Sequence, residues 1–254
     1  MPKPRGTVPL QWHVARWRIE APGRGGLLAL AALTLFLCVP LERLGADMAW
    51  STQANVLVNL GVTLAAVMFG RDAGRSDDAE PWLALQGGSG ADWALARWAA
   101  NTLPLFALAG TWAFVISVVS RILQGPGVPW HGTLGLAAHL ALTAIVLTLL
   151  LLAFGALGIQ QTAEAMLLVL ILTFSVPLLG ERLPTIVRGA LGLILPPMTA
   201  IAAVRDGVVD GDWGDALRAL LRLVTWCGIL LTIALGAADR RVPARPSRKP
   251  RTAT

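Results

Sequence analysis

The sequence predicts an all-α, polytopic membrane protein that crosses the bilayer six times. Of its 254 residues, 55% are hydrophobic and only 14% are charged, whereas soluble domains have about 25% charged residues. The apolar residues are also grouped in long blocks, each near the roughly 20 residues that a helix needs to cross hydrocarbon. Tryptophans stand at the ends of these blocks, as in the aromatic belts of membrane proteins: Trp50, Trp98, Trp130 and Trp213.

The N-terminal segment 1–25 is basic and contains a short amphipathic stretch. Residues 9–20 can form a helix that has Leu10, Val14 and Trp17 on one face, at positions i, i+4 and i+7. A helix of this kind lies in the membrane interface with its apolar face in the lipid. We therefore expect an interfacial helix here, and a disordered basic arm is the alternative.

The segment 26–238 is expected to form the transmembrane domain. The six expected spans are residues 26–44, 53–70, 98–120, 133–157, 165–180 and 223–238. The first block has the basic flank of a signal peptide, but the arm before it is long for a signal, so we expect a retained span. Cys38 and Cys227 lie inside spans, where thiols behave as small hydrophobes, so we expect neither a disulfide nor a metal site.

A further apolar stretch, residues 189–204, is expected not to cross the membrane. Pro196 and Pro197 interrupt it, and an interrupted helix at membrane depth must be shielded by protein. The segment 185–206 is therefore predicted to be a re-entrant segment or an extracellular helical hairpin before the last span.

The distribution of positive charge predicts the orientation. The N-terminal arm carries five Lys or Arg residues, and the basic tail 239–254 carries six. By the positive-inside rule, both termini lie in the cytoplasm and the number of spans is even. We expect a multi-pass protein of the cytoplasmic (inner) membrane. Basic residues clustered at the ends favour anionic lipid as a partner and argue against nucleic acid.

Neither an enzymatic activity nor a cofactor is expected from the residues of the spans and loops. A phosphate-binding loop needs Gly-Lys-Ser/Thr, and the only lysines, Lys3 and Lys249, are each followed by proline. Ionisable groups inside spans mark function, and His139 is the one candidate. A neutral histidine bonded to a neighbouring helix is favoured there over a ligand or a proton relay. We expect no catalytic and no metal-ligating residues.

A serine and a histidine offer an enzymatic alternative. Ser89, in the glycine-rich segment 87–90, and His139 look superficially like the serine–histidine pair of rhomboid intramembrane proteases. However, Ser89 lies in the most charged loop of the chain, and only two predicted spans precede it. A capping role for Ser89 is favoured over a rhomboid-like protease.

The cytoplasmic loop 71–97 is long and contains a predicted helix. Ser89 stands at an N-cap position and Asp92 three residues later, as in a capping box. The helix carries Trp93 as an apolar anchor and Arg97 at the membrane boundary, where lipid phosphate is a second possible partner. A capped helix in a loop this long predicts docking to a cytoplasmic partner, and a solvated loop is the alternative.

The order of these features resembles that of type-2 ABC exporter permeases, the six-span membrane subunits of many bacterial exporters. In that family an interfacial helix precedes the first span, a cytoplasmic coupling stretch follows the second, and a proline-centred segment precedes the last. The matching residues of the coupling stretch are Arg71, Asp72, Gly74, Leu83, Ala84, Leu85, Ser89 and Arg97. Those of the proline-centred segment are Leu195, Pro196, Pro197, Met198, Arg205, Gly207 and Gly211.

The resemblance implies a permease that pairs with a second permease subunit and with a separate ABC ATPase. The residues that it implies for ATPase contact are Arg71, Asp72, Gly74, Trp82, Ser89, Asp92, Trp93 and Arg97. No substrate class follows from it. A membrane scaffold or assembly factor without transport activity is the alternative.

Overall fold

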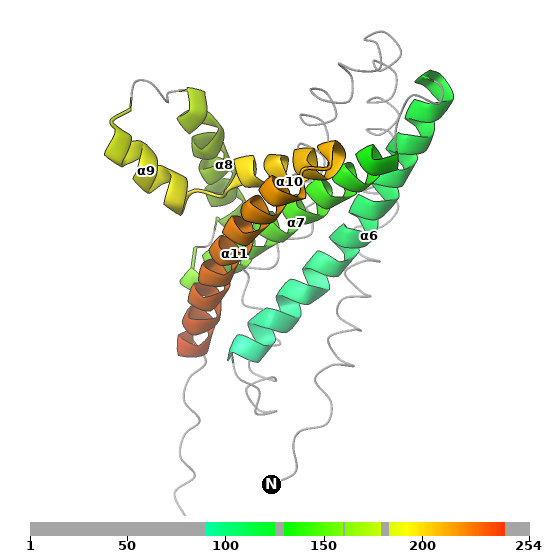
Figure 1. Ribbon diagram of the computed structural model, residues 1–254. Coiled ribbons are helices and arrows are strands. Elements are labelled where there is room, and N and C mark those ends of the chain that lie inside the picture. The colour runs from blue at the N-terminus through cyan, green and yellow to red at the C-terminus, as the bar shows by residue number, and fades with distance from the viewer. Residues whose placement is uncertain (1–89, 125–129, 160, 179–182, 242–254) are drawn as a thin grey trace, which may run out of the picture.

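The computed structural model describes residues 90–124, 130–159, 161–178 and 183–241, and helices are the only regular elements among them (Figure 1). The helices are α6 (Gly90–Gln124), α7 (Trp130–Leu157), α8 (Thr162–Leu178), α9 (Thr185–Ile194), α10 (Met198–Asp210) and α11 (Trp213–Arg241). The predicted interfacial helix, the first two predicted spans, most of the loop 71–97 and most of the tail lie outside the described residues.

Two of the described helices suit a membrane span. They are Gly132–Leu157 within α7 and Trp213–Arg240 within α11, and α9 with α10 would add a third if the bent pair forms one span. In the part of the chain that the structure describes, the prediction of an all-helical fold is therefore confirmed, and two helices are long and apolar enough to span a membrane. The number of six spans stays a prediction.

Helix α7 lies at the centre of the described bundle and contacts α6, α8, α10 and α11. Leu140, Ala144, Leu147 and Leu151 form a stripe along it with no exposed surface. Val146 and other leucines on its remaining faces are buried too. A helix that is apolar on all sides is typical of a buried position, and neighbouring helices occupy these sides (Figure 1).

The proline pair interrupts the apolar stretch 189–204, as predicted. Helix α9 ends at Ile194, α10 begins at Met198, and their axes differ by 74°. Proline has no N–H group and its ring clashes with the preceding turn, so a helix cannot continue through two adjacent prolines without breaking.

The last helix is longer than its apolar block. The predicted span is 223–238, and the helix that contains it, α11, begins ten residues earlier, at Trp213. The charged residues Asp215, Arg218 and Arg222 end the apolar block without ending the helix, because backbone hydrogen bonds do not depend on side-chain polarity. Asp212 begins the helix instead: its Oδ1 accepts a hydrogen bond from the Asp215 N–H at 3.2 Å, which is an N-cap interaction.

A tight turn joins α10 to α11. Gly211, at the end of α10, has a φ of 77°, a left-handed conformation that glycine adopts at little cost. Within α10, a Cβ added to Gly207 would lie 2.7 Å from Ala216 Cβ and 2.8 Å from the Asp212 carbonyl oxygen. Glycine at 207 therefore lets α10 and α11 approach closely.

Candidate functional site

The predicted ATPase-contact residues lie at or before the start of α6. Asp92, Trp93 and Arg97 are in its first turns, and their side chains are outside the described set. The remaining five predicted contact residues precede the described part of the chain: Arg71, Asp72, Gly74, Trp82 and Ser89. Their role therefore stays a prediction.

The start of α6 meets the end of α11. The Ala91 N–H donates a hydrogen bond of 2.7 Å to Asp239 Oδ1. The first N–H groups of a helix have no partner within the helix, and a carboxylate there is also favoured by the helix dipole. Ala94 and Ala234 are buried in one cluster with residues of α7 just behind this contact. The start of α6 and the end of α11 are thus at the same end of the described bundle.

A polar contact joins α6 to α7 farther inside the bundle. Trp98 Nε1 donates to Thr148 Oγ1 at 3.1 Å, and the hydroxyl oxygens of Thr102 and Thr148 are also 3.1 Å apart. Thr148 in turn donates to the Ala144 carbonyl oxygen at 2.8 Å. Trp98 stands at the end of an apolar block, yet it links two helices, a role that its position in the sequence did not indicate.

His139 lies where α7 and α10 cross closely. A Cβ added to Gly135 would lie 2.7 Å from Val209 Cγ2 and 3.3 Å from the Arg205 carbonyl oxygen. One turn farther along α7, His139 is 4% exposed, and its ring is beside the backbone of Ile201 on α10. This is the position against a neighbouring helix that the sequence favoured. Among the described residues, no group of three or more His, Cys, Asp and Glu side chains is placed to hold a metal ion.

The break after α9 is closed by hydrogen bonds from α11. In a continued helix, the N–H of residue 196 would bond to the Gly192 carbonyl oxygen, but Pro196 has none. Arg222 Nη2 donates to this carbonyl oxygen instead, at 3.1 Å. Trp226 Nε1 donates to the Ile194 carbonyl oxygen at 3.4 Å. Side chains of α11 thus replace donors that the break removes.

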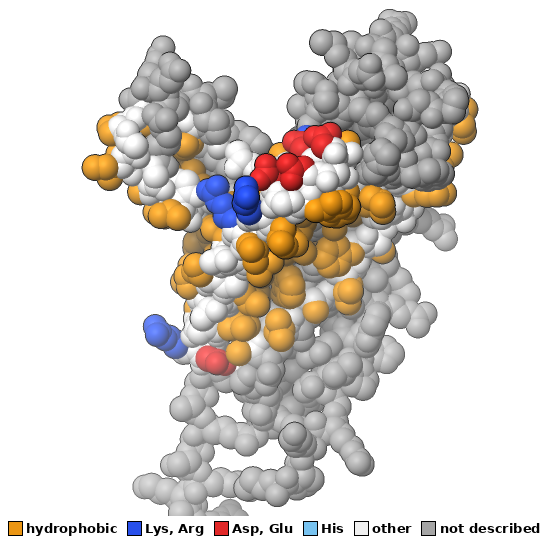
Figure 2. Space-filling view, in the orientation of Figure 1, with side chains coloured by type: hydrophobic (Ala, Val, Ile, Leu, Met, Phe, Trp, Pro, Cys, Tyr) orange, Lys and Arg blue, Asp and Glu red, His pale blue; other side chains and the backbone are white. Residues whose placement is uncertain are grey.

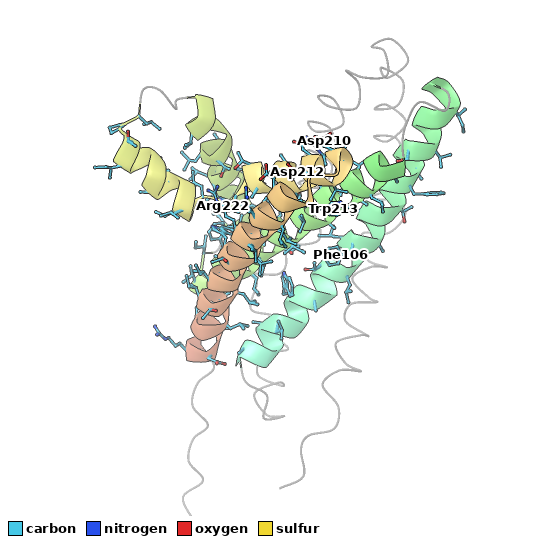
Figure 3. All side chains as sticks on the ribbon, viewed as in Figure 1. Phe106, Asp210, Asp212, Trp213 and Arg222 are labelled. Carbon is cyan, nitrogen blue, oxygen red and sulfur yellow. The ribbon has the colours of Figure 1, made fainter. Side chains whose placement is uncertain are left out.

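Charged side chains gather at the turn between α10 and α11, above a wide apolar band (Figure 2). We call this group the charged rim; its members are Arg205, Asp206, Asp210, Asp212, Asp215, Arg218 and Arg222. Two neighbouring pairs form within it, Arg205 with Asp206 and Arg218 with Asp215, and the Arg218 Nη1–Asp215 Oδ1 distance is 2.8 Å. Figure 3 shows Asp210, Asp212 and Trp213 together at the turn, and Arg222 toward α9.

The rim and the opposite end of α11 bound the apolar band. Sixteen residues, 223–238, separate Arg222 from Asp239 along α11, which is about 24 Å of helix at 1.5 Å per residue. This approaches the roughly 30 Å thickness of bilayer hydrocarbon. The spacing of the rim and of the contact between Ala91 and Asp239 thus suits two opposite membrane surfaces.

Sequence reasoning missed Arg222 and Trp226 as partners of α9. The available signal was Arg222 itself, a cation at the edge of an apolar block, where a charge needs a partner or the membrane surface. Comparison of the chain with protein-family models, with curated proteins and with solved structures finds no match.

Proposed function

We propose that this chain is the membrane-spanning permease subunit of an ABC exporter. It moves a substrate across the cytoplasmic membrane with energy from ATP that a separate subunit hydrolyses. The chain has no nucleotide site of its own in this proposal, since neither Lys3 nor Lys249 is in a phosphate-binding loop.

The observation that carries the proposal is the continuity of α6. This helix runs without a break from Gly90, in the predicted docking segment, to Gln124. Its 35 residues extend over about 52 Å, which exceeds the roughly 30 Å of bilayer hydrocarbon. A helix of this length has room both to cross the membrane and to project from it. Movement of a partner bound at its start would be transmitted along it to the bundle.

The charges at the two ends of α11 support the orientation that an exporter needs. Arg240 and Arg241 end α11 beside the start of α6, and the tail beyond them is basic. The positive-inside rule assigns this end to the cytoplasm, where an ATPase would reach the loop 71–97. In the six-span topology both termini are then cytoplasmic, and the charged rim faces outward.

In the proposed mechanism, two permease subunits enclose the path and each binds one ATPase through the loop 71–97. Closure of the ATPase pair on ATP pushes on the start of α6. The bundle responds as a rigid body and changes between two packings, which is a common form of switching transition.

Purification of the tagged full-length chain from membranes of its own host, in mild detergent, tests the proposal. We expect a P-loop ATPase to co-purify and to be identified by mass spectrometry. The Trp93→Ala variant should insert normally but lose this ATPase, because truncation of an anchoring tryptophan at an interface typically costs about 2 kcal/mol or more.

Trp213→Ala is the matched control, since Trp213 lies at the opposite end of the described bundle (Figure 3). It should retain the ATPase. If no P-loop ATPase co-purifies with the unaltered chain, the proposed exporter function is wrong. If Trp93→Ala retains the ATPase as Trp213→Ala does, the proposed docking site is wrong.

A further inference from the structure

Helix α9 exposes one continuous apolar face. Ile186 is 87% exposed, Leu193 is 77% exposed and Ile194 is 72% exposed. Together with the exposed Ala190 they occupy positions i, i+4, i+7 and i+8, which is one face of a helix. Such a face in a ten-residue helix is unfavourable in water, so an apolar partner must cover it.

The C-terminal end of α9 is fixed at the level of the charged rim. Arg222, a rim residue, bonds to the Gly192 carbonyl oxygen, and Trp226 bonds to that of Ile194. The same two bonds satisfy carbonyl groups that would otherwise be left open at a helix end. With the rim at a membrane surface, as the proposed topology has it, the C-terminal end of α9 lies at that surface (Figure 3).

Helix α9 is bonded to α11, whose own outer surface is apolar. Below the rim, α11 exposes Val224, Ile229 and Ile233, and Figure 2 shows a broad apolar area in this part of the molecule. Figure 2 shows further apolar side chains over α9, beside the rim.

The size of α9 argues against a second copy of the chain as its partner. Ten residues form a helix of about 15 Å, whereas a stable protein interface takes roughly 20–30 residues from each side. Lipid sets no such lower limit, because short amphipathic helices insert individually.

We propose that α9 is a membrane-surface helix, with its face of Ile186, Ala190, Leu193 and Ile194 inserted among phospholipid acyl chains just below the headgroups. Arg222 and Trp226 are positioning residues that hold the helix at this depth. This inference depends on the chain being a membrane protein and is independent of the exporter function.

Lipid-borne quenchers test the depth of α9. The full-length chain, with Cys38 and Cys227 replaced by Ala, carries a single fluorophore on Leu193→Cys and is reconstituted in phosphatidylcholine vesicles. We expect a nitroxide near the lipid headgroup to quench it at least about twofold more strongly than a nitroxide near the acyl end, as a shallow interfacial helix requires. Thr185→Cys, which lies off the apolar face, should be quenched more weakly by both.

Two other results would overturn the proposal. Rapid labelling of Leu193→Cys by a water-soluble maleimide without lipid quenching would show that water covers this face. Slow labelling without quenching would show that protein covers it, either another segment of this chain or a second copy. Neither result would bear on co-purification of an ATPase.

Matched arginine variants test the positioning role. Arg222→Ala should reduce the shallow quenching of Leu193→Cys by about half or more, whereas Arg218→Ala should leave it unchanged, because Arg218 bonds to Asp215 and not to α9. If Arg222→Ala prevents folding, Trp226→Phe keeps an aromatic ring but removes the indole N–H that bonds to Ile194, and it should give a smaller loss in the same direction. Unchanged quenching in a folded Arg222→Ala protein would exclude the positioning role.

Discussion

Helices α7 and α11 both suit a membrane span, but their surroundings differ. In α7, 67% of the most apolar stretch of Gly132–Leu157 is buried within the protein. In α11, only 11% of the most apolar stretch of Trp213–Arg240 is buried. Helix α7 is enclosed by four neighbouring helices. Helix α11 buries Leu223 and Ala234 on one side and leaves Leu217, Leu221 and much of the rest of its length exposed.

This difference shows that one hydropathy signal has two physical causes. Most side chains of α7 are apolar because other helices surround them. Those on the outer face of α11 are exposed among the described residues, and an exposed apolar surface of this kind is typical of contact with lipid or with another subunit. Side-chain volume should therefore matter along α7, whereas on the outer face of α11 only apolar character should matter.

The largest effect is expected from a cavity in α7. Leu147 is fully buried, so Leu147→Ala should cost about 2–5 kcal/mol through the cavity that it leaves. Leu221 on α11 is 59% exposed, and Leu221→Ala should change stability by less than about 0.5 kcal/mol. The unfolding midpoints of both variants in the same detergent measure this. Equal losses would mean that α11 is as tightly packed as α7.

A smaller effect is expected from added volume at the α7–α10 crossing. Gly135→Val should cost about 1–3 kcal/mol, since its side chain must displace Val209 or the α10 backbone. Gly132→Val carries the same change in helix propensity one turn away, where a Cβ meets nothing within 4 Å. The difference between the thermal unfolding temperatures of the two variants measures the cost of the added side chain at the α7–α10 crossing. If Gly132→Val is as destabilising as Gly135→Val, the close approach of α10 is not what requires glycine.

The apolar blocks of the sequence predicted several helices closely. The block 133–157 corresponds to α7 and the block 165–180 to α8, each within three residues at either end. The break at Pro196 and Pro197 was also predicted, because the absence of an N–H group is a local property of proline. Features that depend on a residue and its immediate neighbours were thus accessible from the sequence.

Features that depend on distant residues were not accessible. The predicted span 223–238 did not indicate that the helix itself begins at Trp213, because Arg218 and Arg222 precede the apolar block and lie on the exposed side of the helix. The bonds of Arg222 and Trp226 to α9 join residues about thirty positions apart and follow from the bend between α9 and α10. Hydropathy also could not show which span is central. For the loop 71–97, the predicted contacts stay predictions from the sequence.

The smallest effect concerns the polar contact that attaches α6 to α7. Thr148→Val keeps the shape of the side chain but removes the oxygen that accepts the Trp98 N–H. Interhelical hydrogen bonds in membranes contribute about 0.6 kcal/mol on average and up to about 1.7 kcal/mol, so a loss in this range is expected.

Thr143→Val is the control: its hydroxyl is also buried on α7, but the bond that it donates goes to its own helix, to the His139 carbonyl oxygen at 2.8 Å. The difference between the two unfolding midpoints measures the contact between α6 and α7, and a cycle with Trp98→Phe separates the indole bond from the contact with Thr102. Equal losses in the two threonine variants would mean that packing of apolar side chains, and not this bond, holds α6 against α7.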